Sequence, residues 1–203
     1  MSPPIVVCTI GSPSISVLEA SVQAYVKEGW LHVFEGEEST FGEAYNFALE
    51  TVFRDCDELI LCNDDVVLTP DSHQLLLEDV AALKDRHGAR LGLVAAMADN
   101  ARDIQNVRRT SVVDCREAER VSPIFAWMPK AAFETARFPP LNWYSDDVLC
   151  EDLREHGFHH YISRSYVHHA GSQTVGTDYA KLNAEAMPWL REHRPLYLTR
   201  WFA

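Results

Sequence analysis

The chain has 203 residues, of which 47% are hydrophobic, and its formal net charge is −12. This length suits one well-packed domain and is short for two. No run of about 18 apolar residues occurs, and the amino terminus lacks a basic segment followed by a long apolar core, so we expect no membrane insertion and a cytoplasmic location. The five cysteines are scattered without a CxxC pair, which argues against a disulfide framework and a structural zinc site.

The charge is distributed unevenly along the chain. Residues 1–100 contain 17 acidic and 5 basic side chains, whereas residues 101–203 contain 13 of each. The acidic half would repel nucleic acid at long range. A polyanionic partner therefore stays possible for the second half alone.

The first half alternates apolar, β-branched runs with helical stripes. Strands are expected at residues 5–10, 31–34, 59–62 and 91–96. The first helix should bury Val17, Leu18, Val22, Tyr25 and Val26 and end at Gly29. The second should open at Ser39 and Thr40, and the third should run from a Thr69 cap and Pro70 to Gly88. This β-α order predicts an α/β fold, a three-layer α/β/α sandwich around a mostly parallel sheet.

Residues 99–120 break this alternation and carry five arginines, with four acids among them. The segment is either a long exposed connection or an antiparallel hairpin. A solvated surface is the simpler interpretation, although long loops in compact domains often carry function. A buried strand resumes at residues 124–128.

Residues 57–71 contain the most informative pattern. The apolar run 59–62 is typical of a strand covered on both faces, and it ends abruptly at Asn63, Asp64 and Asp65. In open α/β sheets, ligands bind in the crevice beyond the strand ends. The two acids therefore indicate either a site for a metal or phosphate-bearing ligand, or an acidic turn in solvent.

Two separated motifs resemble the GT-A-fold, family-2-type glycosyltransferases between about residue 4 and residue 175. Residues 63–65, NDD, resemble their DxD motif with the first acid replaced, and FGEAYNFALE resembles the preceding helix, with Asn46 at the usual asparagine. Residues 145–174, SDDVLCEDLREHGFHHYISRSYVHHAGSQT, resemble the E-D-x-D-L-C-x-R-L-R-x-x-G-Y run, the strand after it and an H-x-G-G-like turn. The end of the chain, residues 194–202, faintly resembles the tails of compact, phage-type members.

The resemblance implies a GT-A domain over residues 1–203, with a nucleotide-sugar and metal half (1–100), an acceptor half (101–178) and a C-terminal tail (179–203). It implies a metal-dependent inverting glycosyltransferase that uses a nucleotide-diphospho-sugar, with a UDP-sugar as the expected donor. Mn²⁺ or Mg²⁺ would neutralise the leaving diphosphate. The implied residues are Asp65 with His168 or His169 for the metal, Asp146 with neighbouring Asp147 for the general base, and Thr9, Glu35, Asn63 and Asp64 for the donor.

Each of these residues also has a structural interpretation. Either histidine can be a structural residue, and Asp146 is favourable at a helix start by itself. Glu35 fits an acidic turn over residues 35–38. Trp127 and Trp143 can stack on sugar rings, but tryptophans are more often core residues.

Two other functions compete with glycosyl transfer. A sugar-phosphate nucleotidylyltransferase should have a basic, glycine-rich loop after the first strand, and GSPSIS has no Lys or Arg. A non-catalytic module for nucleotide-sugars or glycans is disfavoured by the retained Asp65 and Asp146.

The acceptor is left as either a saccharide, free or lipid-linked, or a hydroxymethylated pyrimidine in phage-type DNA. The five arginines of residues 99–120 could contact DNA phosphates.

Overall fold

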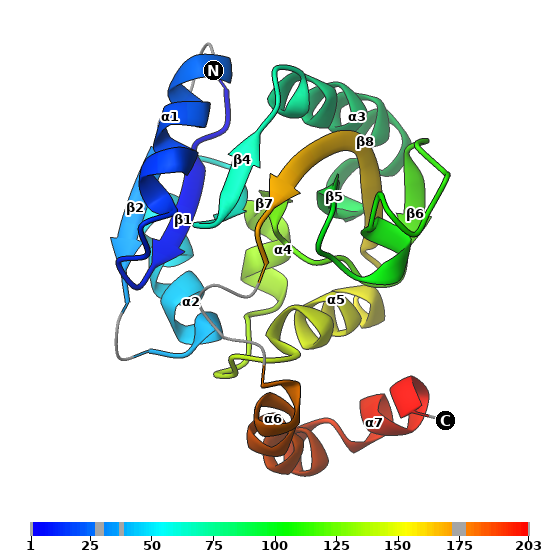
Figure 1. The fold of residues 1–203 in the computed structure, drawn as a ribbon. Coiled ribbons are helices and arrows are strands. Elements are labelled where there is room, and N and C mark those ends of the chain that lie inside the picture. Colours follow the sequence, from blue (N-terminus) through cyan, green and yellow to red (C-terminus); the bar gives the residue numbers. More distant parts are fainter. Residues whose placement is uncertain (1, 27–30, 37–38, 172–177, 203) are drawn as a thin grey trace.

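A single β-sheet forms the centre of the protein, and helices cover both of its faces (Figure 1). The computed structural model describes residues 2–26, 31–36, 39–171 and 178–202. The strands within these residues are β1 (Ile5–Thr9), β2 (Leu31–Glu35), β3 (Glu58–Asn63), β4 (Val66–Leu68), β5 (Leu91–Ala98), β6 (Arg116–Ala118), β7 (Phe125–Pro129) and β8 (His159–His169). The helices are α1 (Ile15–Tyr25), α2 (Phe41–Val52), α3 (Ser72–His87), α4 (Lys130–Thr135), α5 (Ser145–Glu155), α6 (Tyr179–His193) and α7 (Pro195–Phe202), with short 3-10 turns η1 (Gly88–Arg90) and η2 (Asp103–Gln105).

The strands of the sheet follow the order β2-β1-β3-β7-β5-β8-β4, and β6 also pairs with β8. β1 is parallel to β2 and β3, and β5 is parallel to β8. β7 lies antiparallel between β3 and β5, so those two strands share one direction. Among the described strands, β1, β2, β3, β5 and β8 therefore run the same way, which confirms the predicted mostly parallel α/β sheet. β4, β6 and β7 run against them.

The alternation of side chains along the strands separates two hydrophobic layers. In β1, Ile5 and Val7 pack with α1 and α3, while Val6 packs with α2, α4 and α5 on the opposite face. Successive residues of a strand point to opposite faces, so each buried strand contributes to both layers. The result is the predicted three-layer sandwich.

The local sequence predicts the start of α2 and the end of α3 correctly, but not the start of α3. Thr40 caps α2 in a capping box with Glu43, as its sequence predicts. The prediction that Thr69 caps α3 is wrong. The N-cap is Asp71, because the Thr69 N–H donates to Ser72 Oγ and leaves Thr69 in the turn after β4. The helix ends at Gly88 as predicted, with φ of 53°.

The predicted apolar stripe of α1 is only partly buried. Leu18 and Val22 are in the core, whereas Val17 is 51% exposed and Tyr25 is 40% exposed. This short helix contacts the sheet along a narrow line, so residues at the margins of the stripe face solvent. The predicted end at Gly29 lies outside the described residues.

Residues 99–120 form a long connection, which excludes a hairpin closed within the segment, because β6 pairs with β8 instead. The buried Gln105 side chain holds the connection against the sheet. Its Nε2 donates to the carbonyls of Ala96 (2.7 Å) and Ser122 (2.9 Å), and its Oε1 accepts from the Ser122 N–H (2.9 Å). These bonds fix the position of the connection next to β5.

The C-terminal helices α6 and α7 pack beside α5, at the bottom of the view in Figure 1. A small cluster of Leu141, Val148, Ala186, Leu190 and Tyr197 joins them to the body. Partly buried polar bonds reinforce it: the Asp152 carboxylate accepts two bonds from Arg194 (2.9 and 2.8 Å) and one from the Tyr197 hydroxyl (2.6 Å). No helix of the described ranges is long and apolar enough to span a membrane.

Candidate functional site

The turn between β3 and β4 is buried. Asp64 and Asp65 are only 2% and 5% exposed, so the interpretation of an acidic turn in solvent is wrong. The Thr9 hydroxyl donates to Asp64 Oδ2 at 2.7 Å. The parallel pairing of β1 and β3 aligns Cys8 with Asn63 and so brings Thr9 and Asp64 together at the strand ends. Two of the residues expected at the donor site are therefore bonded to each other.

Asp65 forms a close pair with His169. Asp65 Oδ1 lies 3.1 Å from His169 Nε2, and Asp65 Oδ2 accepts the Gly171 N–H at 3.0 Å. The pairing of β4 with β8 places His169 opposite Val66, beside Asp65. His169 Nδ1 bonds to the Asn100 carbonyl at 2.5 Å, which turns Nε2 toward the acid.

The protonation of this pair follows from its contacts. Burial acts to raise the pKa of Asp65, but the bonds from His169 and from the Gly171 N–H outweigh it and lower that pKa. Burial acts to lower the pKa of His169, yet the bond to Asp65 raises it above its ordinary value. A carboxylate and an imidazolium are therefore stabilised side by side.

The chemistry of this pair fits a divalent cation that is shared with a phosphate-bearing ligand. A carboxylate oxygen suits Mg²⁺ or Mn²⁺, and an imidazole nitrogen favours Mn²⁺. Within the described part of the chain, no three His, Cys, Asp or Glu side chains lie close enough to share one ion. Mg²⁺-type sites commonly use one or two protein ligands and complete their coordination with phosphate oxygens and water. The Asn63 amide, 3.4 Å from His169 Nε2, borders the same place.

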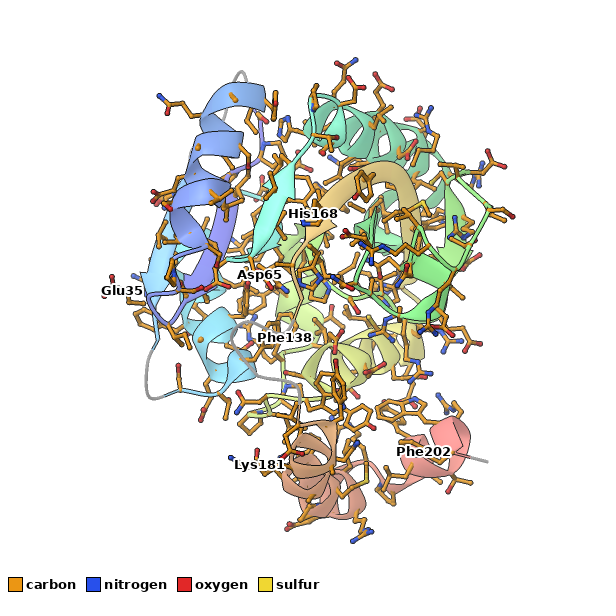
Figure 2. All side chains as sticks on the ribbon, viewed as in Figure 1. Glu35, Asp65, Phe138, His168, Lys181 and Phe202 are labelled. Carbon is orange, nitrogen blue, oxygen red and sulfur yellow. The ribbon has the colours of Figure 1, made fainter. Side chains whose placement is uncertain are left out.

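His168 faces away from Asp65. Neighbouring residues of β8 point to opposite faces, and His168 Nδ1 lies 2.6 Å from Asp99 Oδ2 instead. Its side chain is 52% exposed, and Arg108 contacts the same Asp99 oxygen at 3.2 Å. Figure 2 shows His168 and Asp65 in the centre of the molecule. Of the two candidate histidines, His169 is the one that contacts Asp65.

Glu35 lies at the exposed end of β2, where it pairs with Thr9 of β1, and Figure 2 shows it at the left of the view. Beside it is a hollow of about 150 Å³ between the strand ends and α2. The hollow is lined by Cys8, Phe34, Glu35, Gly36, Ser39, Glu43, Ala44 and Phe47. The carboxylate of Glu35 is therefore accessible to a ligand bound next to Thr9.

The acids at the start of α5 are held by arginines. Arg102 extends one nitrogen to Asp146 Oδ2 (2.9 Å) and the other to Asp147 Oδ1 (2.8 Å). Arg120 reaches Asp147 Oδ1 at 3.1 Å. The Asp147 side chain is 12% exposed and carries two arginines, whereas that of Asp146 is 21% exposed and carries one. Asp146 is the more accessible acid.

The electrostatics also distinguish Asp146. Burial, followed by the charge of Asp147, raises the pKa of Asp146, and Arg102 acts in the opposite direction. A carboxylate with a raised pKa is a stronger base once it is ionised. The start of α5 therefore presents an acid suited to accept a proton.

One short segment, residues 99–102, connects the two groups of acids. The Asp99 carboxylate accepts the His169 N–H (2.8 Å), the Asn100 carbonyl bonds to His169 Nδ1, and Arg102 binds Asp146 and Asp147. The sequence favoured a solvated surface for these residues, with the arginines as possible contacts to DNA phosphates. Asp99, Asn100 and Arg102 have no periodic signal, because their partners lie on β8 and α5, far along the chain.

Two backbone features lie at the start of α5: an unusual φ at Tyr144 and a close approach of Gly42 to residues 139 and 145. Tyr144, immediately before the helix, has φ of 65°, an uncommon value for a non-glycine residue. Its ring stacks on Trp201 with centroids 5.7 Å apart, and its hydroxyl donates to Asn183 at 2.6 Å. At Gly42 of α2, a Cβ would lie 1.8 Å from the Pro139 carbonyl, so only glycine allows that approach.

The remaining aromatic and basic candidates have structural partners. Trp127 is 2% exposed and donates to Glu58, so its role as a sugar platform is excluded by burial. Trp143 packs on Tyr144 and Tyr179. The five arginines do not form one open basic face: Arg102 and Arg120 point to the acids of α5, Arg116 bonds to loop carbonyls, and Arg108 and Arg109 contact Asp99 and Asp103.

No family model matches the sequence, and no curated protein matches it. The structure is similar to A197 from STIV, with a TM-score of 0.56 and 14% identity over 80% of this chain and 81% of that one. It is similar to S. aureus TarS 1–349 in complex with UDP-GlcNAc, with a TM-score of 0.59 and 16% identity over 94% of this chain and 67% of that one. Against S. aureus TarS itself the TM-score is 0.57 at 17% identity, and the chain spans 40% of its length. These similarities show a shared fold, and the predicted GT-A fold is confirmed.

Proposed function

We propose that this protein is a metal-dependent inverting glycosyltransferase that moves a sugar from a UDP-sugar to an acceptor hydroxyl. The observation that carries the proposal is the pair of Asp65 and His169 beside the bonded Thr9 and Asp64, with Asp146 held across residues 99–102. On a GT-A fold, these groups supply a cation site, a donor site and a base. The structural similarity to S. aureus TarS in complex with UDP-GlcNAc supports UDP as the nucleotide.

The donor would bind along the ends of β1, β2 and β3. Glu35 lines the hollow beside Thr9, where a nucleoside can enter. Asp64 is fixed by Thr9, and Asn63 borders the cation pair, and both would face the ribose and diphosphate of the donor. Parallel strand ends are the usual ligand crevice of such sheets, which agrees with this orientation.

Asp65 and His169 would hold the cation. Mn²⁺ or Mg²⁺ bound there would neutralise the charge that develops on the leaving diphosphate. Because the imidazole must be neutral to bind a metal, His169 would release the proton that it shares with Asp65. The Asn100 carbonyl, bonded to Nδ1, keeps Nε2 directed at the site.

Asp146 would act as the general base. Its carboxylate takes the proton of the acceptor hydroxyl as the acceptor oxygen attacks the anomeric carbon. The bond from that carbon to the β-phosphate oxygen breaks, and the diphosphate leaves with the electron pair. A single displacement of this kind inverts the anomeric configuration, and the base contributes on the order of 10²–10⁴-fold to the rate.

The acceptor that we favour is a saccharide. The alternative, a hydroxymethylated pyrimidine in DNA, needs a basic surface for phosphates and extrusion of the base from the duplex. The arginines that would form that surface are engaged with acids or carbonyls of the protein. Only Arg108 and Arg109, which are 66% and 64% exposed, extend toward solvent.

A panel of nucleotide-sugars tested by thermal shift, with and without Mn²⁺, examines the proposal. A donor at about 100 times its Kd should add about 2.7 kcal/mol of stability and raise Tm by several degrees. We expect this rise for a UDP-sugar only when Mn²⁺ is present, together with slow release of UDP. The proposal would be contradicted if no nucleotide-sugar raised Tm in an Mn²⁺-dependent way. It would also be contradicted if Tm rose but no UDP was released in the presence of glycan acceptors.

A further inference from the structure

Arg102 is held in one position by bonds from each of its guanidinium nitrogens. Nε donates to Ser122 Oγ at 3.0 Å, Nη1 to Asp147 at 2.8 Å and Nη2 to Asp146 at 2.9 Å. Ser122 is itself fixed, because its N–H donates to the buried Gln105 side chain. The planar fork of an arginine matches two acceptors only in a fixed geometry. Arg102 therefore defines where the Asp146 carboxylate lies.

The charges around Asp146 balance only when Arg102 is present. The titratable and charged groups that face it and its neighbour are Asp147, Arg102, Arg120, Cys150 and Tyr144. Two adjacent carboxylates face two guanidinium groups, and Arg120 contacts Asp147 alone. Without Arg102, Asp146 would keep a carboxylate neighbour and lose its cationic partner. Two neighbouring carboxylates without a cation between them favour protonation of one of the two acids.

We propose that Arg102 is a positioning residue that keeps Asp146 ionised and, by holding its Oδ2, orients the carboxylate to receive the acceptor proton. This inference rests on the base function proposed for Asp146. A purely structural ion pair is not sufficient to explain the geometry. Asp147 is the more buried acid and already has Arg120, yet one arm of Arg102 extends to the more accessible Asp146.

The first test is a direct titration that needs no substrate. The protein is labelled with carbon-13 at the aspartate carboxyl, and the Asp146 signal is assigned by its absence in Asp146→Asn. We expect the Asp146 titration midpoint in Arg102→Gln to rise by roughly 1–3 pH units, the range for loss of an adjacent opposite charge. Arg109→Gln is the matched control, since it removes an exposed arginine–aspartate pair from the same connection. An unchanged midpoint in Arg102→Gln would overturn the inference.

The second test follows UDP release from UDP-GlcNAc in Mn²⁺, with water as the acceptor. In Arg102→Gln the acid limb of the kcat profile should move to higher pH by the same amount as the carboxyl titration. At pH values below both midpoints kcat should fall about tenfold for each unit of that shift, with donor KM unchanged, whereas well above both midpoints kcat should be close to wild type. Arg102→Lys, which keeps the charge but lacks the planar fork, should leave the acid limb close to its wild-type position. A loss of kcat that is equal at every pH would indicate a merely structural role and overturn the inference.

A double variant separates charge from folding. Arg102→Gln with Asp147→Asn removes both the cation and the competing carboxylate, so the Asp146 midpoint and the kcat values on the acid limb should return toward wild type. Without such recovery, charge balance is not the reason for Arg102. If the titration shifts as expected but UDP release does not depend on Asp146, the proposed function of Asp146 fails while the electrostatic role of Arg102 stands. If Arg102→Gln alone does not fold, Arg102→Lys and the double variant supply the same comparison.

Discussion

The two ends of the candidate site are built in different ways. At the β3–β4 turn, Asp64 and Asp65 meet Thr9 and His169 because strand register aligns them. At the start of α5, Asp146 and its neighbour are held by arginines that come from an irregular connection. At the strand ends, backbone pairing brings the residues together, and their side-chain bonds then fix them. The helix start depends on long-range side-chain bonds, so its geometry and charge are easier to change.

The largest expected effect is at the strand ends. Asp65→Asn should abolish the Mn²⁺-dependent stabilisation by UDP-sugar, because an amide replaces the anionic ligand. A ligand in an exposed turn would tolerate alanine without loss of stability, but Asp65 is buried and accepts bonds from His169 and Gly171. Asp65→Ala therefore also leaves buried partners unsatisfied and should destabilise the fold. Thermal shift with titrated Mn²⁺ measures both effects, and retained Mn²⁺-dependent UDP affinity in Asp65→Asn would remove Asp65 as a ligand.

The next effect is at the helix start. Asp146→Asn should preserve donor binding but lower kcat by about 10²–10⁴-fold, because it removes a group that acts only in the chemical step. Asp147→Asn should lower kcat less, since Asp147 is already occupied by two arginines. Steady-state kinetics of both variants test the difference. Normal turnover by Asp146→Asn together with an inactive Asp147→Asn would move the base by one residue.

His160 of β8 bridges β5 and α5, and its burial gives a pH-dependent stability. Its Nδ1 accepts the Leu93 N–H of β5, and Nε2 bonds to the Cys150 carbonyl of α5. Burial lowers the pKa of His160 to about 4, below its usual value of about 6.5. The unfolded chain therefore binds this proton first, and stability is lost as pH falls from about 6.5 to about 4, by at most about 3 kcal/mol. Urea unfolding across this range, compared with His160→Gln, measures it, and equal pH dependence in both proteins would exclude His160 as the cause.

The smallest expected effect is at the contact between α7 and the start of α5. Trp201 stacks on Tyr144, lies over Arg120 and donates to Glu151, so Trp201→Ala should cost about 2 kcal/mol of stability. Leu196→Ala is the control, because Leu196 is 73% exposed on the same helix. Denaturant unfolding and kcat of both variants test this contact. A change in kcat equal to that of Leu196→Ala would show that the α7 contact does not position α5.

Local sequence was sufficient for most elements of the fold and for the place of the acids of residues 63–65 directly after a buried strand. β-branched runs, the Thr40 capping box and Gly88 report short-range preferences, and acids after a buried strand fall at a sheet edge in any such fold. The antiparallel β7 could not be predicted, because strand direction depends on the path of the chain between elements. The start of α3 was misplaced for a related reason, since the Ser72 hydroxyl accepts the Thr69 N–H and donates to the Tyr166 carbonyl of β8.

Within the site, the sequence determined the residue types and the tertiary structure decided their partners. The sequence does not distinguish His168 from His169. Side chains alternate between the two faces of β8, so of these two residues His169 points to Asp65. Asp146 and Asp147 are equally placed in the motif, and the second arginine on Asp147 distinguishes them. The sequence did not indicate that Arg102 binds the acids of α5, because this contact joins residues that are 44 and 45 positions apart in the chain. Hydrogen bonds and charge pairs at such separations are set by the packed fold, and no local pattern of residues encodes them.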